Sequence, residues 1–151
     1  HCPSSNMKLA CGGTLSFPPY RDAGVDVRIG TDGAASSGNG LNLLHEARLA
    51  SLVQRHVHWD STLLPAQGIF KMATKGSQDW VAWDLDDIRM RPLGRSNNRH
   101  LANLIYNGGE CLDVWVNGRA LRKNGVTLSL DEKNIIAELD HAVESYYEGV
   151  E

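Results

Sequence analysis

The stretch that decides the fold is V-D-V-R-I-G-T-D-G-A-A-S, residues 25–36, with a helical pattern that begins soon after it at Leu41. Apolar and charged residues alternate over 25–29, which is the period of two expected of a short strand. Glycines and other small residues follow, so Asp32 lies just past the carboxyl end of the predicted strand with little bulk around it. A strand, a glycine-rich loop and a helix in this order favour an α/β fold, either a barrel or a doubly wound sheet.

The residues on either side of this stretch extend the pattern. Leucine, alanine and valine side chains between 41 and 53 cover more than a narrow stripe, which predicts a helix buried on much of its circumference. On this helix, Glu46 and Arg48 are explained equally well by a structural ion pair and by a functional role. A shorter helix is predicted over 65–73. Residues 1–20 are rich in proline and glycine and are predicted to form loops.

The second half of the chain has the character of a small sheet. Residues 80–85 are rich in aromatic and β-branched side chains and predict a strand, whose tryptophans we expect to pack on the sheet. Residues 86–103 are polar and are predicted to be a surface connection. The dipeptide Asn117-Gly118 lies between two apolar runs, and it supplies the positive φ angles that a two-residue hairpin turn needs. A further short strand is predicted over 126–128.

The C-terminal residues predict one amphipathic helix. Ser129 and Glu132 have the S-x-x-E spacing of a capping box, and apolar residues follow at steps of three and four up to Gly149. The opposite face of this helix is acidic and is expected to be solvated.

Composition excludes several classes of protein. The chain has 151 residues, of which 42% are hydrophobic and 22% charged, so wholesale disorder is excluded. Its formal net charge of −3 is opposite to that of a general nucleic-acid binder or a polybasic membrane-surface protein. No apolar run approaches the roughly 20 residues that span a bilayer. The three cysteines form no C-x-x-C pair, so we expect neither a disulfide framework nor a zinc ribbon, and we predict a cytoplasmic location.

Asp32 has two interpretations. In barrel enzymes the carboxyl edge of the strands carries the catalytic groups. A carboxylate at that edge can ligate a metal ion and can also accept a proton. Alternatively, Asp32 caps the turn that follows it, as aspartate often does. Its position alone leaves both interpretations open.

Other polar residues are weaker candidates. His1 can supply a ligand, a hydrogen bond to substrate or only a loop terminus. Ser36 can hydrogen-bond a ligand or cap the following helix. His56 and His58 have the H-x-H spacing of a metal pair. They follow a helix rather than a strand, however, so we expect them to face solvent at the helix end.

Three segments together resemble a known family. They are H-C-P-S-S-N-M-K-L (1–9), the run from Asp22 to Ser36 with its G-T-D-G-A-A-S, and L-N-L-L-H-E-A-R-L-A (41–50). Further likeness lies in 64–66, 72–74, 84–86 and 114–118. On these residues the chain resembles the amidohydrolase superfamily, within it the branch of methylthioadenosine/S-adenosylhomocysteine deaminases and triazine chlorohydrolases.

The resemblance implies a metal-dependent (β/α)8 barrel with a small β-sandwich domain. Residues 1–78 would be the last barrel segments, with His1 ending strand seven and Asp32 ending strand eight. Residues 79–151 would be the C-terminal part of the sandwich, including a closing helix over 131–149.

The resemblance also implies roles for particular residues. Asp32 would bind a divalent metal, zinc or iron, and would shuttle the proton of the attacking water. Ser36 would lie near the ribose or tail of the substrate, and His1 would contact the substrate. The family's other ligands, an H-x-H after strand one and histidines after strands five and six, would lie upstream of His1. The chain has no initiator Met, and we expect it to be a piece of a longer protein and inactive alone.

One departure from the family pattern affects the link between the two parts. Residues 74–80 join them almost directly, where the family has a glycine-containing segment of a dozen or more residues.

The function implied is a hydrolytic deaminase of an adenine-type nucleoside or thioether. The alternatives are a guanine or triazine amidohydrolase or chlorohydrolase, and a non-catalytic scaffold domain. We expect a purine nucleoside-like small molecule as the substrate, no nucleic-acid or membrane partner, and a homo-oligomeric full-length protein.

Overall fold

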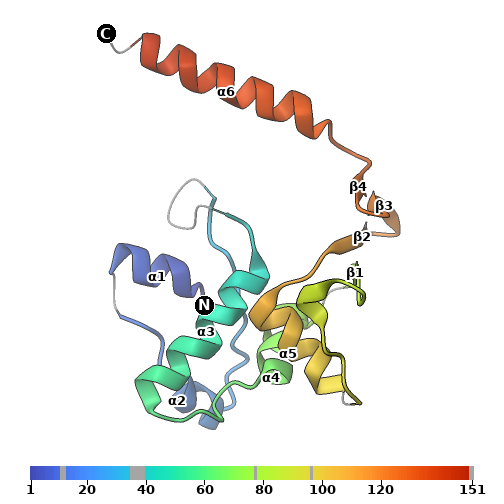
Figure 1. The fold of residues 1–151 in the computed structure, drawn as a ribbon. Helices are drawn as coiled ribbons and strands as arrows, with labels where there is room; N and C mark the ends of the chain where they lie inside the picture. The colour runs from blue at the N-terminus through green and yellow to red at the C-terminus, as the bar shows by residue number, and fades with distance from the viewer. Residues whose placement is uncertain (11–12, 35–39, 77, 96, 150–151) are drawn as a thin grey trace. The chain divides into compact units, whose positions relative to one another are not determined.

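The computed structural model describes residues 1–10, 13–34, 40–76, 78–95 and 97–149. The chain divides into two compact units, His1–Ser77 with Leu85–Gly109, and Gln78–Asp84 with Glu110–Glu151. Figure 1 labels the elements in chain order. The first unit is helical among its described residues, and the second holds the sheet and the C-terminal helix.

The helices of the first unit are α1 (Pro3–Leu9), α2 (Phe17–Asp22), α3 (Leu43–His58), α4 (Ala66–Thr74) and α5 (Asn97–Asn107), with a short 3-10 helix η1 (Ile88–Met90). The predicted helices over 41–53 and 65–73 are confirmed as α3 and α4. Asn42 begins α3 by accepting a hydrogen bond from the His45 amide through its side chain, at 3.0 Å.

Two predictions of irregular structure are wrong. Residues 1–20 contain α1 and the start of α2. In each of these helices a proline lies in the first turn, where its missing amide hydrogen costs no helical hydrogen bond, so the prolines do not prevent helix formation. Residues 86–103 contain η1 and most of α5. The helix is explained by its last turns, where Leu104 and Ile105 are only 5% and 2% exposed. The surface connection predicted from the sequence ends at residue 103 and therefore does not include these apolar residues.

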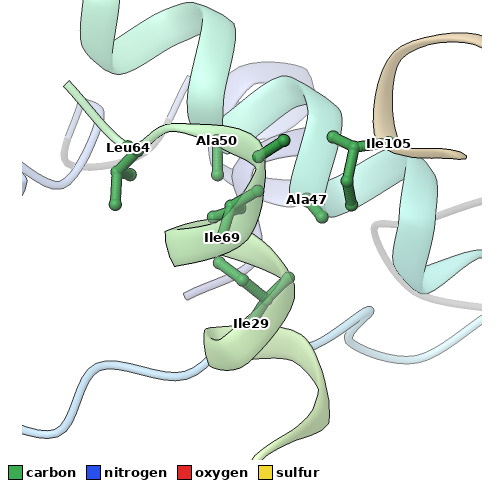
Figure 2. Packing of buried hydrophobic residues seen from close by; sticks show 7 residues of the cluster. Ile29, Ala47, Ala50, Leu64, Ile69 and Ile105 are labelled. Atoms are coloured by element: carbon green, nitrogen blue, oxygen red, sulfur yellow. The ribbon is translucent and has the colours of Figure 1, made fainter. Parts of the chain in front are cut away.

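The core of the first unit lies between α3, α4 and α5. Figure 2 shows side chains from these helices and from the segment before Asp32 packed against one another. The buried members of this cluster are Ile29, Ala47, Ala50, Leu64, Ala66, Ile69 and Ile105. Because Ile29 is part of the core, the segment that leads to Asp32 is fixed to the helices.

The predicted strand over 25–29 differs from the structure. Its first residues form a tight turn, in which the Val27 amide donates to the Val25 carbonyl at 3.0 Å. Only its last residues are paired: the amino group of His1 donates to the Arg28 carbonyl at 2.8 Å, and the Gly30 amide donates to the His1 carbonyl at 3.0 Å. These two bonds flank Ile29 in the pattern of a parallel ladder.

Charged side chains fasten the start of this segment to the end of α4. Asp26 accepts hydrogen bonds from Lys75 at 3.0 Å and from Arg28 at 2.9 Å. Arg28 also donates to the Lys75 carbonyl at 2.8 Å. The two cations hold the pKa of Asp26 below its ordinary value, with the Lys75 hydrogen bond as the largest cause.

The second unit contains an antiparallel sheet in the order β1-β2-β3-β4. Its strands are β1 (Trp80–Trp83), β2 (Cys111–Val116), β3 (Arg119–Lys123) and β4 (Val126–Thr127). The predicted hairpin is confirmed, with Asn117 and Gly118 at φ values of 50° and 75° between β2 and β3. Trp80 faces Trp115 across β1 and β2, and their rings stack with centroids 5.2 Å apart.

The last helix, α6 (Glu132–Glu148), ends at Gly149 as predicted. The predicted capping box at Ser129 is wrong, because Asp131 is the cap and accepts a hydrogen bond from the Asn134 amide at 3.1 Å. The helix therefore begins two residues later than the capping box predicts. The Asp131 carboxylate caps the first turn in the way that a serine side chain would. No helix in the described part of the chain has the length and apolar character required to cross a membrane.

Candidate active site around Asp32

Asp32 lies three residues beyond the buried Ile29, in a left-handed backbone conformation with φ of 57°. Aspartate tolerates this conformation better than most residues because its short polar side chain can bond locally. Its Oδ1 accepts a hydrogen bond from the Gly33 amide at 2.7 Å. The local bond is what the turn-cap interpretation predicts, so the backbone places the Asp32 carboxylate at the surface with one oxygen held by the turn.

The other carboxylate oxygen is held from a distant part of the chain. Ser5 in α1 donates its hydroxyl to Asp32 Oδ2 at 3.0 Å, across a sequence separation of 27 residues. A turn cap alone does not call for this second bond. These two donors hold one oxygen of the Asp32 carboxylate each, and so they orient it.

His1 lies beside Ile29 through the two backbone bonds that flank this residue. His1 is thus the partner of Ile29, and Asp32 follows Ile29 by three residues on the carboxyl side of the parallel pair, where barrel enzymes place their catalytic groups. The His1 Nε2 atom is buried and has no hydrogen-bond partner among the described residues. A buried ring nitrogen without a partner is rare in proteins and calls for a ligand or water.

The other candidate residues predicted from the sequence are Ser36, His56 and His58. Ser36 lies outside the described residues. His58 is half-buried, with its Nε2 3.2 Å from the Ser16 hydroxyl, and His56 is exposed near the end of α3, as expected. Among the residues that the structure describes, no three His, Cys, Asp or Glu side chains lie close enough together to hold a metal ion.

The structure adds Ser5, which sequence reasoning missed, and shows the contacts of Glu46, whose role the sequence left open. Ser5 lies in the H-C-P-S-S-N segment, but nothing in its local pattern indicates contact with Asp32. Glu46 is only 3% exposed, and its Oε2 accepts a hydrogen bond from the Ser4 amide at 2.9 Å and from the Cys2 thiol at 3.6 Å. Arg48 is exposed. The buried Glu46 carboxylate thus binds the start of α1, and these contacts rather than an ion pair with Arg48 explain its position.

Known proteins are similar to this chain in sequence. The model of the amidohydrolase family matches residues 1–84. A 5-methylthioadenosine/S-adenosylhomocysteine deaminase of Bacillus cytotoxicus is 32% identical over 91% of this chain and 35% of its own length. An enzyme of the same name from Archaeoglobus fulgidus is 34% identical over 91% of this chain and 36% of its own length. The chain therefore spans about a third of the length of the curated relatives it matches.

Solved structures of enzymes also match the fold of this chain. An adenosine deaminase from Xanthomonas campestris, crystallised with bound zinc, matches 96% of this chain and 36% of its own chain with a TM-score of 0.83 and 29% identity. An atrazine chlorohydrolase from Arthrobacter aurescens, complexed with zinc, matches 91% of this chain and 34% of its own chain with a TM-score of 0.73 and 25% identity. The α/β class predicted from the sequence is confirmed, and because the family model covers more than half of the residues, the chain belongs to the amidohydrolase family.

Proposed function

We propose that this chain is the C-terminal part of a metal-dependent amidohydrolase that hydrolyses a C–N bond in a small purine nucleoside-like molecule. The observation that carries the proposal is the Asp32 carboxylate, which follows the His1–Ile29 pairing and is oriented by Ser5 and Gly33. Relatives named as deaminases support the reaction class. In this proposal residues 1–78 belong to the barrel and residues 79–151 to the sandwich domain.

The described residues fit one part of a metal site. The Asp32 carboxylate is an oxygen ligand that zinc accepts, and it lies three residues beyond the paired Ile29. The described residues do not offer the three or four ligands of a complete site. We therefore propose Asp32 as one ligand of a divalent cation, zinc first and iron as the alternative, whose other ligands belong to the rest of the enzyme. A cation bound there would lower the pKa of a water molecule toward about 7.

The chain's own contribution is proton transfer. As the water oxygen forms a bond to the amino-bearing ring carbon, Asp32 accepts the proton that the water loses. Asp32 then returns this proton to the amino group, the C–N bond breaks, and ammonia leaves. The second proton of the water moves from the new hydroxyl to the neighbouring ring nitrogen, so the carbon becomes a carbonyl. The bonds from Ser5 and Gly33 hold the carboxylate in one orientation for both transfers.

Two further residues are proposed to bind the substrate. The buried His1 Nε2 would gain the hydrogen-bond partner that it lacks among the described residues. Ser36, four residues after Asp32, is proposed to contact the ribose or the tail of the nucleoside.

A second candidate function is dechlorination of a triazine, which the likeness to atrazine chlorohydrolase favours. The same water addition would then expel chloride in place of ammonia. A non-catalytic scaffold is the third possibility, and it would require neither metal nor a reactive carboxylate. We further propose a homo-oligomeric full-length enzyme and, from the number and spacing of the cysteines, a cytoplasmic location.

The test is a product assay on the full-length enzyme after zinc loading. It would be supplied in separate reactions with 5′-methylthioadenosine, S-adenosylhomocysteine, adenosine, guanine and a chlorotriazine. Release of ammonia from the adenine compounds supports the proposal, whereas chloride release from the triazine alone favours the second candidate. Absence of any hydrolysis, with the metal bound in full, would contradict both enzymatic functions.

A further inference from the structure

The Ser5 hydroxyl reaches Asp32 from a short helix that needs support. A seven-residue helix such as α1 has little stability of its own, because nucleation is costly and few hydrogen bonds repay it. Ser5 is nevertheless 7% exposed, and its hydroxyl is 3.0 Å from Asp32 Oδ2. The position of this donor therefore depends on what holds α1.

Glu46 provides that support from α3. Its buried Oε2 accepts the Ser4 amide at 2.9 Å, which is one of the orphan amides at the start of α1. A carboxylate is favoured there by the positive end of the helix. The next residue, Ala47, is completely buried in the core, so the backbone that carries Glu46 is fixed. A buried carboxylate is costly, and an apolar side chain at this position would avoid the cost but could not hold α1.

We propose that Ser5 is a positioning residue for Asp32 and that Glu46 acts through α1 to place Ser5. The inference rests on the proposed function of Asp32 and adds two residues to it. The terminal torsion of an aspartate is broad, and the Ser5 hydroxyl adds a restraint from outside the turn to the local bond from Gly33. The second bond, from Ser5, fixes the plane of the carboxylate relative to the water it deprotonates.

Ser5→Ala in the full-length enzyme tests the first step. A hydrogen bond to a charged group corresponds to about a 10- to 100-fold effect, so we expect kcat to fall by about that factor while KM stays within about twofold. Glu46→Gln keeps the size and an acceptor for the Ser4 amide but removes the charge, and we expect a smaller fall in kcat of about 3- to 10-fold.

Ser51→Ala is the matched control. It removes the same atom from a fully buried serine of the same unit, whose hydroxyl donates to the Leu64 carbonyl at 2.8 Å and lies 2.8 Å from the Tyr106 hydroxyl. We expect this variant to lower the melting temperature and to leave kcat of the folded enzyme within about twofold. If Ser5→Ala behaves like Ser51→Ala, losing stability without a selective loss of kcat, Ser5 has only a structural role.

A second measurement separates this inference from the proposed function. Amide hydrogen exchange of the full-length enzyme reports on Gly33, which donates to Asp32 Oδ1. If Ser5 holds the carboxylate, Ser5→Ala accelerates exchange at Gly33 and Ser51→Ala does not. An inactive wild-type enzyme would refute the proposed function, yet the exchange experiment would still test the Ser5–Asp32 bond. Unchanged exchange at Gly33 in Ser5→Ala overturns the inference.

Discussion

The backbone of His1 makes two hydrogen bonds that flank Ile29, one to the Arg28 carbonyl and one from the Gly30 amide. This relationship joins the first residue of the chain to the segment that carries Asp32. Because Ile29 is also part of the helical core, the pairing holds His1 beside the segment that leads to Asp32. The candidate site is therefore built by residues that the chain brings together over nearly thirty positions.

The 151-residue chain alone should not catalyse deamination and should bind zinc weakly. The described residues offer no group of three ligands, and one carboxylate encloses no cation. The measurements are ammonia release from 5′-methylthioadenosine and equilibrium dialysis against zinc, with Asp32→Asn in the same chain as the control. Measurable turnover by the isolated wild-type chain would contradict this expectation.

The core of the first unit should depend strongly on Ile69. This side chain is completely buried between α3, α4 and α5, so Ile69→Ala should lower the free energy of unfolding by about 2–5 kcal/mol. Ile88→Ala makes the same chemical change at a residue of the same unit that is 84% exposed, and it should change stability by only about 0.5 kcal/mol. Urea denaturation of both variants provides the comparison, and equal losses would show that the cluster is not the core.

The pKa of Asp26 should rise toward its ordinary value when Lys75 is replaced by glutamine. The Lys75 hydrogen bond is the largest cause that lowers this pKa, and Arg28 adds to it. Since the folded-state pKa is depressed, the stabilising contribution of Asp26 is present above pH 3.8 and is lost as the pH falls through the folded-state pKa.

A carbon-13 NMR titration of the Asp26 carboxyl group measures this change. Lys71→Gln, which removes a positive charge from the last turn of α4, is the control and should leave the pKa of Asp26 unchanged. An unchanged pKa in Lys75→Gln would show that the ion pair does not form in solution.

Local chemistry explains which elements could be predicted from the sequence. The turn at Asn117 and Gly118 needs positive φ angles that these two residue types supply, so the hairpin was evident without its surroundings. The α3 helix was evident from its apolar pattern and α6 from its periodicity and Gly149. By contrast, α5 joins a polar first turn to a buried last turn, and only its packing against α3 and α4 makes it a helix.

The candidate site could be predicted only in part, for a similar reason. Asp32 was identified because a strand-like pattern and small residues surround it in the sequence. Its bond to Ser5 crosses 27 residues and depends on how α1 is anchored by Glu46, which no local pattern encodes. The buried state of Glu46 also follows from its position relative to α1 and not from its neighbours in the sequence.

The central claim is that Asp32 binds the metal and moves the proton, and Asp32→Asn in the full-length enzyme tests it most directly. Asparagine keeps the size and one coordinating oxygen but cannot act as a base at this position. Bound zinc should fall only partly, the melting temperature should change little, and kcat should fall by about 10²–10⁴-fold. Asp22→Asn, an exposed aspartate of the same unit paired with Arg21, is the matched control and should retain wild-type kcat. Asparagine caps turns as well as aspartate does, so a near-wild-type kcat in Asp32→Asn would leave Asp32 as a turn residue and contradict the account.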